Sequence, residues 1–386
     1  MNGFKKYLSN TAWMVGGRIS KAVLNFAVGI FVARYLGPER FGVLNYAMGL
    51  SLLFSVFGAM GLDSILVREL VRNEDKRNIL LGSALSIRLV GGIVAFVLTI
   101  FMLWITHVDS ETWLLTLICS ASLFFRATDV LRSFFESEVN AKTIASVEGV
   151  QSVITSFLRI YFIAIEGDVV WFALCWLLDW VFIGIGFALI YRIKFGGFRF
   201  WKVDKDTLSY LVREGLPLII SSMAIIAYQQ IDKVMLKNML GASGNEQLGF
   251  YSAALRIMPF VLLIPLMLSK AVAPSLIKAQ ETDFHKYEER SQIFMDVMTW
   301  IGVGLSVILF LYAHPIIFLY GDSYNAATPL LKIIAWKGLF NSMSVAASLL
   351  IITEGLQKWA VLRNLAGCAV NICLNILLIF LFNFNT

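Results

Sequence analysis

The sequence predicts an all-α protein that crosses a membrane many times, and three observations carry this prediction. Apolar residues make up 58% of the 386-residue chain, and only 15% of the residues are charged. The mean hydropathy of +0.76 exceeds what the core of a soluble protein requires. The apolar residues form continuous runs typical of membrane helices, not the short alternating stretches of a membrane β-barrel.

Eleven runs of about 20 mainly apolar residues define the expected spans. They cover residues 11–33, 41–62, 80–105, 113–135, 144–165, 169–191, 214–237, 248–270, 293–313, 326–352 and 361–382. The first run follows Lys5 and Lys6 as a signal peptide would, but it is too long and too charged, and no small-residue cleavage site follows it. We therefore expect it to be retained as a span.

The basic residues of the chain indicate its orientation. With the N-terminus inside, the loops on that side carry most of the Lys and Arg residues, Arg132 among them, whereas the other side has little beyond Arg34, Arg40 and Lys237. This asymmetry predicts a cytoplasmic N-terminus and an external C-terminus. It also accounts for the net charge of +6 without a nucleic-acid partner.

Motifs for enzymatic chemistry are absent from the sequence. It contains no G-x-x-x-x-G-K-[ST] phosphate loop, no G-x-S-x-G nucleophile elbow and no histidine or cysteine cluster with zinc-ligand spacing. The four cysteines lie inside predicted spans, where we expect them to pack as small apolar residues. External loops such as "THVDSET" and "EGDV" are too short to hold a catalytic site. We therefore expect the protein to bind no cofactor and to have no enzymatic activity.

The two halves of the chain resemble each other. Residues 34–50, "RYLGPERFGVLNYAMGL", and residues 238–257, "NMLGASGNEQLGFYSAALRI", share Leu-Gly, a polar turn and an apolar-Gly pair, followed by an aromatic and a small residue. Six spans separate the two copies, so both have the same orientation, and their axis runs along the membrane normal. We expect an N-terminal lobe of six helices over residues 1–200 and a C-terminal lobe with five over residues 201–386.

The polar stretch between the halves, residues 192–215, mixes cations with aromatic residues. We expect it to link the lobes and to lie at the lipid headgroups as an interfacial anchor.

Polar residues recur inside the spans at spacings that place them on one helix face. These stripes are Arg18, Lys21 and Asn25; Glu148, Gln151, Ser152, Thr155 and Arg159; Ser222, Gln229, Asp232 and Lys233; Lys337, Asn341, Ser344 and Ser348; and Asn364, Asn371 and Asn375. Single charges occur at Arg88, Asp179, Arg256 and Asp296. A charge at the bilayer centre costs on the order of 3 kcal/mol, so these residues should line a cavity or form pairs. Glu148 with Arg159 and Asp232 with Lys233 are candidate structural pairs.

The charges suggest a division of roles. Cations in the N-terminal half, Arg18, Lys21, Arg88 and Arg159, suit an anion that crosses the membrane, such as the phosphate or pyrophosphate of a lipid carrier. Intramembrane acids such as Asp232 and Asp179 are candidates for binding a proton or a sodium ion that drives transport.

Several stretches resemble one family. "ARYLGPERFGVLNYA" after a basic first span, "YQQIDKVML" in the seventh span, "HPIIFLYGDSYNAATPLLKIIAW" across the ninth and tenth, and the six-plus-six arrangement are similar to polysaccharide flippases of the Wzx type. These belong to the multidrug/oligosaccharidyl-lipid/polysaccharide (MOP) superfamily, which includes the MATE transporters. The resemblance covers nearly the whole chain.

The resemblance implies two six-helix lobes around a central cationic cavity, of which we expect this chain to supply eleven helices and to lack the last. It implies a bacterial or archaeal inner-membrane flippase that moves an undecaprenyl-pyrophosphate-linked oligosaccharide, such as an O-antigen or lipopolysaccharide unit or an exopolysaccharide unit, by alternating access. A polysaccharide polymerase is then a candidate protein partner. The glycan would meet polar side chains, for which we select Asn25, Gln151, Gln229, Asn341 and Asn371.

Three other functions stay open. A peptidoglycan-precursor flippase carries the same pyrophosphate. A cation-coupled drug exporter would favour an acidic cavity, whereas this N-terminal half is basic. A polysaccharide polymerase, ligase or glycosyltransferase would place active-site residues in a large external loop, and this chain has none.

Overall fold

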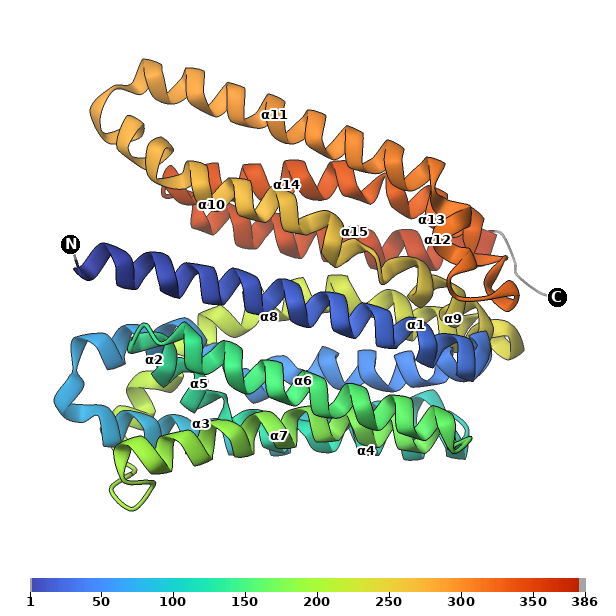
Figure 1. The fold of residues 1–386 in the computed structure, drawn as a ribbon, viewed down its shortest axis with the longest axis horizontal. Coiled ribbons are helices and arrows are strands. Elements are labelled where there is room, and N and C mark those ends of the chain that lie inside the picture. The colour runs from blue at the N-terminus through green and yellow to red at the C-terminus, as the bar shows by residue number, and fades with distance from the viewer. Residues whose placement is uncertain (1, 382–386) are drawn as a thin grey trace. The chain divides into compact units, whose positions relative to one another are not determined.

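The computed structural model describes residues 2–381, and every regular element in that range is helical (Figure 1). The helices are α1 (Asn2–Ala59), α2 (Leu62–Arg72), α3 (Arg77–Thr106), α4 (Ser110–Phe125), α5 (Asp129–Ser137), α6 (Ala141–Ala164), α7 (Val169–Phe195), α8 (Lys205–Met239), α9 (Gly244–Leu255), α10 (Met258–Thr282), α11 (Phe284–Leu311), α12 (Ala313–Phe318), α13 (Ala327–Ala335), α14 (Lys337–Thr353) and α15 (Gln357–Leu381). Helices satisfy every backbone hydrogen bond within one segment, as a lipid environment demands. The predicted all-α fold is confirmed.

Ten stretches of the described residues are long and apolar enough to cross a membrane. The first, Val15–Arg72, contains two of the predicted spans, because Gly37 breaks α1 with a φ of 71° and a ψ of 170°. Glycine adopts a positive φ without strain, and the following Pro38 suits the first turn of a new helix. The break therefore accounts for the eleven spans expected from the sequence.

Four helices of the described chain begin at a side-chain cap. Asp109, Asn140, Asp204 and Asp283 each accept a hydrogen bond from the backbone N–H three residues further on. Such caps satisfy amides that have no partner inside the helix. The Thr207 amide lowers the pKa of the Asp204 carboxyl, so the charge of Asp204 serves the start of α8.

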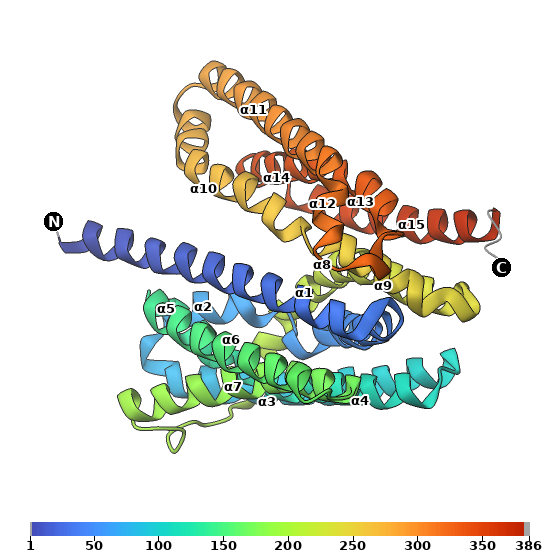
Figure 2. The same ribbon diagram turned by 45° about the vertical axis from the view of Figure 1, so that its right-hand side comes forward.

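One compact unit combines the described residues up to Val32 with Val43–Gly244 and the residues from Asn371. Within it α7 lies alongside α4 and α6 (Figures 1 and 2). Its core joins α2, α3, α5 and α7 through Leu66, Leu81, Phe134 and Phe187, all of them buried. These interlocking side chains hold the helices that carry the polar groups described below.

A second compact unit combines Ala33–Gly42 with Asn245–Val370. Leu276 of α10, Met298 of α11 and Ala346 of α14 form part of its core. The short segment of α1 is held there by Tyr324, whose hydroxyl donates a hydrogen bond of 3.0 Å to the carbonyl of Ala33. Residues 33–42, the turn within α1, thus contact the connection between α12 and α13.

The two stretches that resemble each other in sequence meet in this second unit. A Cβ atom on Gly42 would lie 1.8 Å from the backbone oxygen of Asn245, and one on Gly249 would lie 1.9 Å from that of Pro38. Each carbonyl belongs to the residue four positions before the other glycine, so the contact is reciprocal. This symmetry supports the internal repeat. The lobe boundary between residues 200 and 201 stays a prediction.

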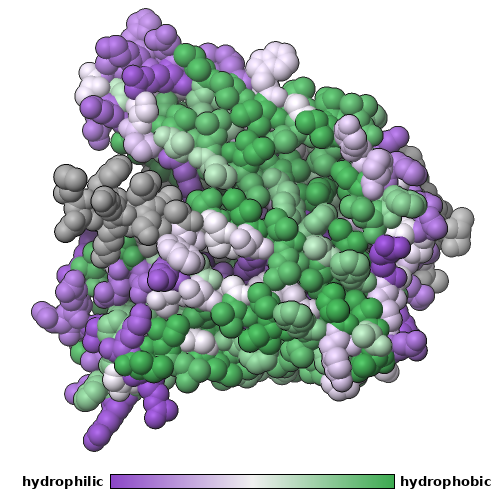
Figure 3. Space-filling view, viewed as in Figure 1, coloured by the Kyte–Doolittle hydropathy of each residue, from purple (hydrophilic) through white to green (hydrophobic). Residues whose placement is uncertain are grey.

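The surface of the helices suits a lipid environment. On the face drawn in Figure 3, hydrophobic side chains cover the flanks of the helices and hydrophilic ones gather near the helix ends. Large apolar residues such as Trp104 of α3 and Phe157 of α6 are exposed. Exposed apolar surface of this extent marks contact with a membrane in a helical protein of this hydropathy.

Candidate functional site

Small residues bring the first half of α1 close to α6. A Cβ atom on Gly17 would lie 2.8 Å from the Cβ atom of Ala145. Along α6, Ala141, Ala145 and Gly149 recur every fourth residue and so share one face. Small residues at this spacing allow close packing of membrane helices. The approach of the two helices places their polar residues opposite each other.

Two pockets flank this helix contact, and together we call them the α1/α6 groove. One, of about 220 Å³, is lined by Gly17, Arg18, Arg132, Glu136, Val139, Asn140, Ala141, Ile144, Ala145 and Glu148. The other, of about 490 Å³, is lined by Trp13, Gly16, Gly17, Ser20, Lys21, Leu24, Ala145, Gly149, Ser152 and Val153. The groove therefore combines charged and hydroxyl side chains with an apolar wall.

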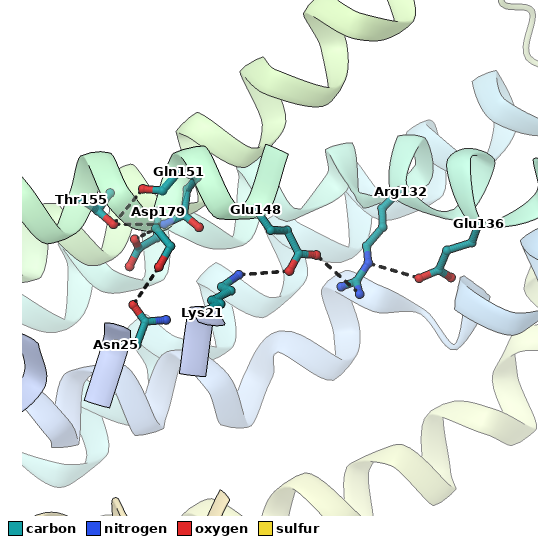
Figure 4. Close-up of polar contacts among 9 residues, drawn as sticks. Lys21, Asn25, Arg132, Glu136, Glu148, Gln151, Thr155 and Asp179 are labelled. Atoms are coloured by element: carbon teal, nitrogen blue, oxygen red, sulfur yellow. Dashed lines mark hydrogen bonds and ion pairs between the residues drawn. The ribbon is translucent and has the colours of Figure 1, made fainter. Parts of the chain in front are cut away.

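A chain of ion pairs runs along the groove (Figure 4). Lys21 Nζ lies 3.2 Å from Glu148 Oε2, and Arg132 Nη2 lies 3.6 Å from Glu148 Oε1. Arg132 Nε lies 3.3 Å from Glu136 Oε1, one helical turn away. Arg18, which is exposed, adds a third cation to these two carboxylates. The charged side chains that line the groove therefore carry net positive charge.

Polar contacts continue along α6 toward α7. Ser152 Oγ donates a 3.1 Å hydrogen bond to Asn25 Oδ1 on α1. Gln151 donates hydrogen bonds to Asp179 and Thr155, and Figure 4 shows these three side chains. Arg159 Nη2 lies 2.5 Å from Asp179 Oδ2. The predicted residues Lys21, Asn25, Gln151, Arg159 and Asp179 thus lie on neighbouring faces of α1, α6 and α7.

Arg88 on α3 lies in a different environment. Its side chain is only 1% exposed, and its guanidinium lies 2.5 Å from the carboxylate of Asp63, whose side chain is 71% exposed. Nearby Arg126 stacks over the ring of Trp180 at 4.3 Å. In this conformation Arg88 joins α3 to α2 through a half-buried ion pair.

The remaining predicted residues fall on α8, α14 and α15. Asn375 Nδ2 donates a 2.8 Å hydrogen bond to Asp232 Oδ1 and lies 3.4 Å from Asn371 Oδ1. Gln229 is exposed on α8, and Asn341 is half-buried on α14 in the second unit. Asp232 and Asn371 are thus brought together through a neighbouring amide. The roles of all predicted site residues stay predictions.

The structure does not pair Glu148 with Arg159, which the sequence analysis offered as a candidate pair. Glu148 contacts Lys21 and Arg132, while Arg159 contacts Asp179. Sequence reasoning assigned Arg132 to a cytoplasmic loop and overlooked it, together with Glu136, as a groove residue. Their spacing of four residues on a short helix was a usable signal, since it predicts an ion pair on one face.

Two family models match the sequence of this chain. A model described as "polysaccharide biosynthesis protein" matches residues 7–280, and the MatE model matches residues 217–377. Together with the all-helical fold, these matches define the class of the protein, a multi-pass membrane transporter of the MOP superfamily. The chain belongs to the polysaccharide biosynthesis protein family. No curated protein sequence matched the chain.

Solved structures agree in fold over nearly the whole chain. An inward-facing multidrug resistance MATE transporter is 18% identical with a TM-score of 0.67, and the match covers 95% of this chain and 96% of that one. An outward-facing MATE transporter is 18% identical, with coverages of 98% and 96% and a TM-score of 0.57. A MOP transporter from Pyrococcus furiosus, described by the reverse polarity of its binding pocket, is 17% identical, with coverages of 97% and 95% and a TM-score of 0.52. At such identities the likeness concerns the fold.

Proposed function

We propose that the protein is a flippase for an undecaprenyl-pyrophosphate-linked oligosaccharide, the repeat unit of a surface polysaccharide such as O-antigen or exopolysaccharide. It moves this lipid from the inner to the outer leaflet by alternating access. Membership in the polysaccharide biosynthesis protein family supports a lipid-linked oligosaccharide as the transported substrate. The observation that carries the proposal is the α1/α6 groove, where three cations face two carboxylates inside a membrane protein.

Arg18 and Lys21 bind the pyrophosphate in this proposal. Arg18 is exposed to the groove, and Lys21 shares the carboxylate of Glu148 with Arg132. An entering phosphate replaces Glu148 as the partner of one cation while the other keeps it. Because Lys21 and Arg132 each keep an anion at every stage, the exchange avoids leaving either of these two charges unpaired.

Arg159 and Arg88 complete the cationic set from positions that are already ion-paired. Arg159 holds Asp179 beside Gln151, and Arg88 holds Asp63, so both orient carboxylates in the same compact unit. Asn25, Gln151, Gln229, Asn341 and Asn371 offer amides to the sugar hydroxyls. Such amides donate and accept hydrogen bonds without adding charge.

Asp232 and Asp179 are the proposed sites of coupling to H⁺ or Na⁺. Asp179 is paired with Arg159, and Asp232 accepts a hydrogen bond from Asn375, which also contacts Asn371. Ionisable groups inside the bilayer commonly serve ion pathways.

The proposed location is the inner membrane of a bacterium or archaeon, with the N-terminus in the cytoplasm, as the basic loops predict. A polysaccharide polymerase is the proposed protein partner, because it would consume the translocated unit. A peptidoglycan-precursor flippase is the second candidate, since the groove charges suit any lipid pyrophosphate.

Transbilayer movement of a lipid-linked oligosaccharide in proteoliposomes tests the function. The wild type should move the lipid, and the double variant Arg18→Ala/Lys21→Ala should not. A matched control, Lys270→Ala/Lys278→Ala, removes two exposed cations of α10 and should behave as wild type.

Two results would contradict the proposal. Undiminished movement in the Arg18 and Lys21 double variant would exclude the groove as the anion path. Chemical alteration of the lipid without movement would indicate a polymerase, ligase or glycosyltransferase.

A further inference from the structure

Residues 192–205, which comprise the last turn of α7, the connection to α8 and the first residue of α8, have a defined conformation. Gly196 and Gly197, with φ of 81° and 87°, end α7 and turn the chain back. Trp201 Nε1 then donates a 3.0 Å hydrogen bond to the hydroxyl of Tyr191 on α7. The rings of Phe198 and Trp201 pack edge to face with centroids 5.0 Å apart. The segment therefore folds onto the end of α7.

The same segment is attached to the start of α3. The Lys202 N–H donates a 3.2 Å hydrogen bond to the carbonyl of Asn78, and the Asp204 N–H donates one of 3.2 Å to Ser83 Oγ. A Cβ atom on Gly82 would lie 2.4 Å from the Lys202 carbonyl oxygen, so the two backbones touch. These contacts lie within the first compact unit and hold the segment in a fixed position against α3.

Cations and apolar side chains are both exposed along this segment. The exposed cations are Arg192, Lys194, Arg199, Lys202 and Lys205. Between them Ile193 is 81% exposed, Phe200 59% and Val203 58%. Acids close to the segment include Asp204, whose charge caps α8, the exposed Asp206, and the buried Glu69, which lines a pocket with both of them. The surface is therefore both basic and apolar.

The position of the segment along the membrane normal follows from the length of α7. Its 27 residues span roughly 40 Å at about 1.5 Å each, while the hydrocarbon core is about 30 Å thick. The last turn of α7 carries Arg192 and Lys194, so this polar end of the helix extends into the headgroup region. The half-buried Trp201 suits the same depth, because tryptophan favours the membrane interface.

We propose that residues 192–205 form a docking surface for anionic phospholipid headgroups. The cations bind the phosphates, while Ile193, Phe200 and Val203 insert at the boundary with the acyl chains. This mixture favours a lipid surface over a nucleic acid, which would leave these apolar side chains in water. The depth of the segment in the membrane favours lipid over an acidic protein. The surface is separate from the α1/α6 groove, so the inference does not depend on the proposed function.

Lipid retention by the purified full-length protein tests the proposal without any substrate. The protein is reconstituted in equal parts of phosphatidylglycerol and phosphatidylcholine and then partly stripped with detergent. The retained lipids are counted by native mass spectrometry. The wild type should retain phosphatidylglycerol preferentially, and Arg192→Gln/Lys194→Gln/Arg199→Gln/Lys202→Gln should lower that preference roughly tenfold or more.

The matched control removes the same charge elsewhere. Lys270→Gln/Lys278→Gln/Lys286→Gln/Arg290→Gln, on α10 and α11, should keep the preference of the wild type. The segment variant keeps the hydrogen bond between Trp201 and Tyr191, so it should fold like the wild type. An unchanged thermal unfolding temperature checks this. The variant Phe200→Ser/Val203→Ser keeps every cation and should weaken retention of both lipids.

Three results would overturn the inference. One is equal retention of phosphatidylglycerol by the segment variant and the wild type. Another is an equal fall in the segment variant and the matched control, which would show an effect of net charge alone. The third is a segment variant that keeps its lipid but loses a protein partner in cross-linking, which would assign the surface to that partner.

Discussion

Gly42 and Gly249 each face the backbone carbonyl of the residue four positions before the other, so two helices related by the internal repeat touch backbone to backbone. Only glycine permits this approach, because any Cβ atom would occupy the place of the carbonyl oxygen. Contacts between Cα hydrogens and carbonyl oxygens at such crossings add modest stability. The relationship links the first hairpin to α9 within one compact unit.

Replacing either glycine with alanine should therefore loosen the second unit. A methyl group 1.8 or 1.9 Å from an oxygen forces the helices apart, and we expect a loss of about 1–3 kcal/mol, as for overpacked cores. Thermal unfolding in detergent measures the change. Gly304→Ala on α11 is the control, since nothing lies within 4 Å of its added Cβ atom, and its stability should not fall. Equal unfolding temperatures for all three variants would refute the close contact.

The ion pair of Lys237 and Asp109 should contribute to stability unequally, so that removing one partner destabilises the protein more than removing the other. Lys237 Nζ lies 3.3 Å from Asp109 Oδ1, and their side chains are 7% and 53% exposed. Asp109→Asn leaves a buried ammonium without its counter-charge and should cost about 2 kcal/mol, whereas Lys237→Met leaves a carboxylate that water can reach and should cost less than about 1 kcal/mol. Denaturation of both variants measures the difference, and the reverse order would show that burial does not govern this pair.

Glu148 should limit how tightly the groove binds anions. Glu148→Gln frees Lys21 and Arg132 from their shared carboxylate, so affinity for a short-chain prenyl pyrophosphate should rise roughly fivefold. Lys21→Gln should lower the affinity by a similar factor. Calorimetry at two salt concentrations provides the measurement, because added salt should reduce both differences. Identical affinities in all three proteins would place the anion elsewhere.

Asp232 is proposed to couple transport to an ion gradient. Asp232→Asn removes the ionisable group but keeps a side chain that can bond to Asn375, so transport should continue without responding to an imposed pH or sodium gradient. Asn375→Ala keeps the carboxylate and should stay responsive. Transport assays in proteoliposomes with each gradient applied separately distinguish these results. A gradient response that survives in Asp232→Asn would remove this role from the residue.

The cap of α8 should make stability depend on pH at acidic values. The pKa of Asp204 lies below its ordinary value because the Thr207 amide donates to the carboxylate. The stabilisation is therefore complete above the pKa of the unfolded chain, about 3.9, and is lost as the pH falls through the lower pKa of the folded protein. Asp204→Asn keeps a good cap that does not titrate. Unfolding temperatures measured from about pH 6 to about pH 2 should converge for the two proteins at the acidic end, and parallel curves would argue against the cap.

Several features of the fold and site could be read from single stretches of the chain. The all-α class and the spans follow from runs of apolar residues, because the bilayer acts on each segment by itself. The stripe of Arg18, Lys21 and Asn25 follows from helical spacing alone. Even the repeat was visible, since Gly42 and Gly249 occupy matching places in two similar motifs.

What only the tertiary structure decided is which groups meet. Lys21 pairs with Glu148, 127 residues away on another helix. Arg88 is buried against Asp63. Arg132, which the sequence placed in a loop, lines the groove. The physical reason is that hydropathy and helical period are properties of one segment, whereas an ion pair requires two helices packed at a particular distance and rotation. The sequence by itself thus determined a transporter with charges in its spans, and the packing of α1 on α6 determined how those charges are combined.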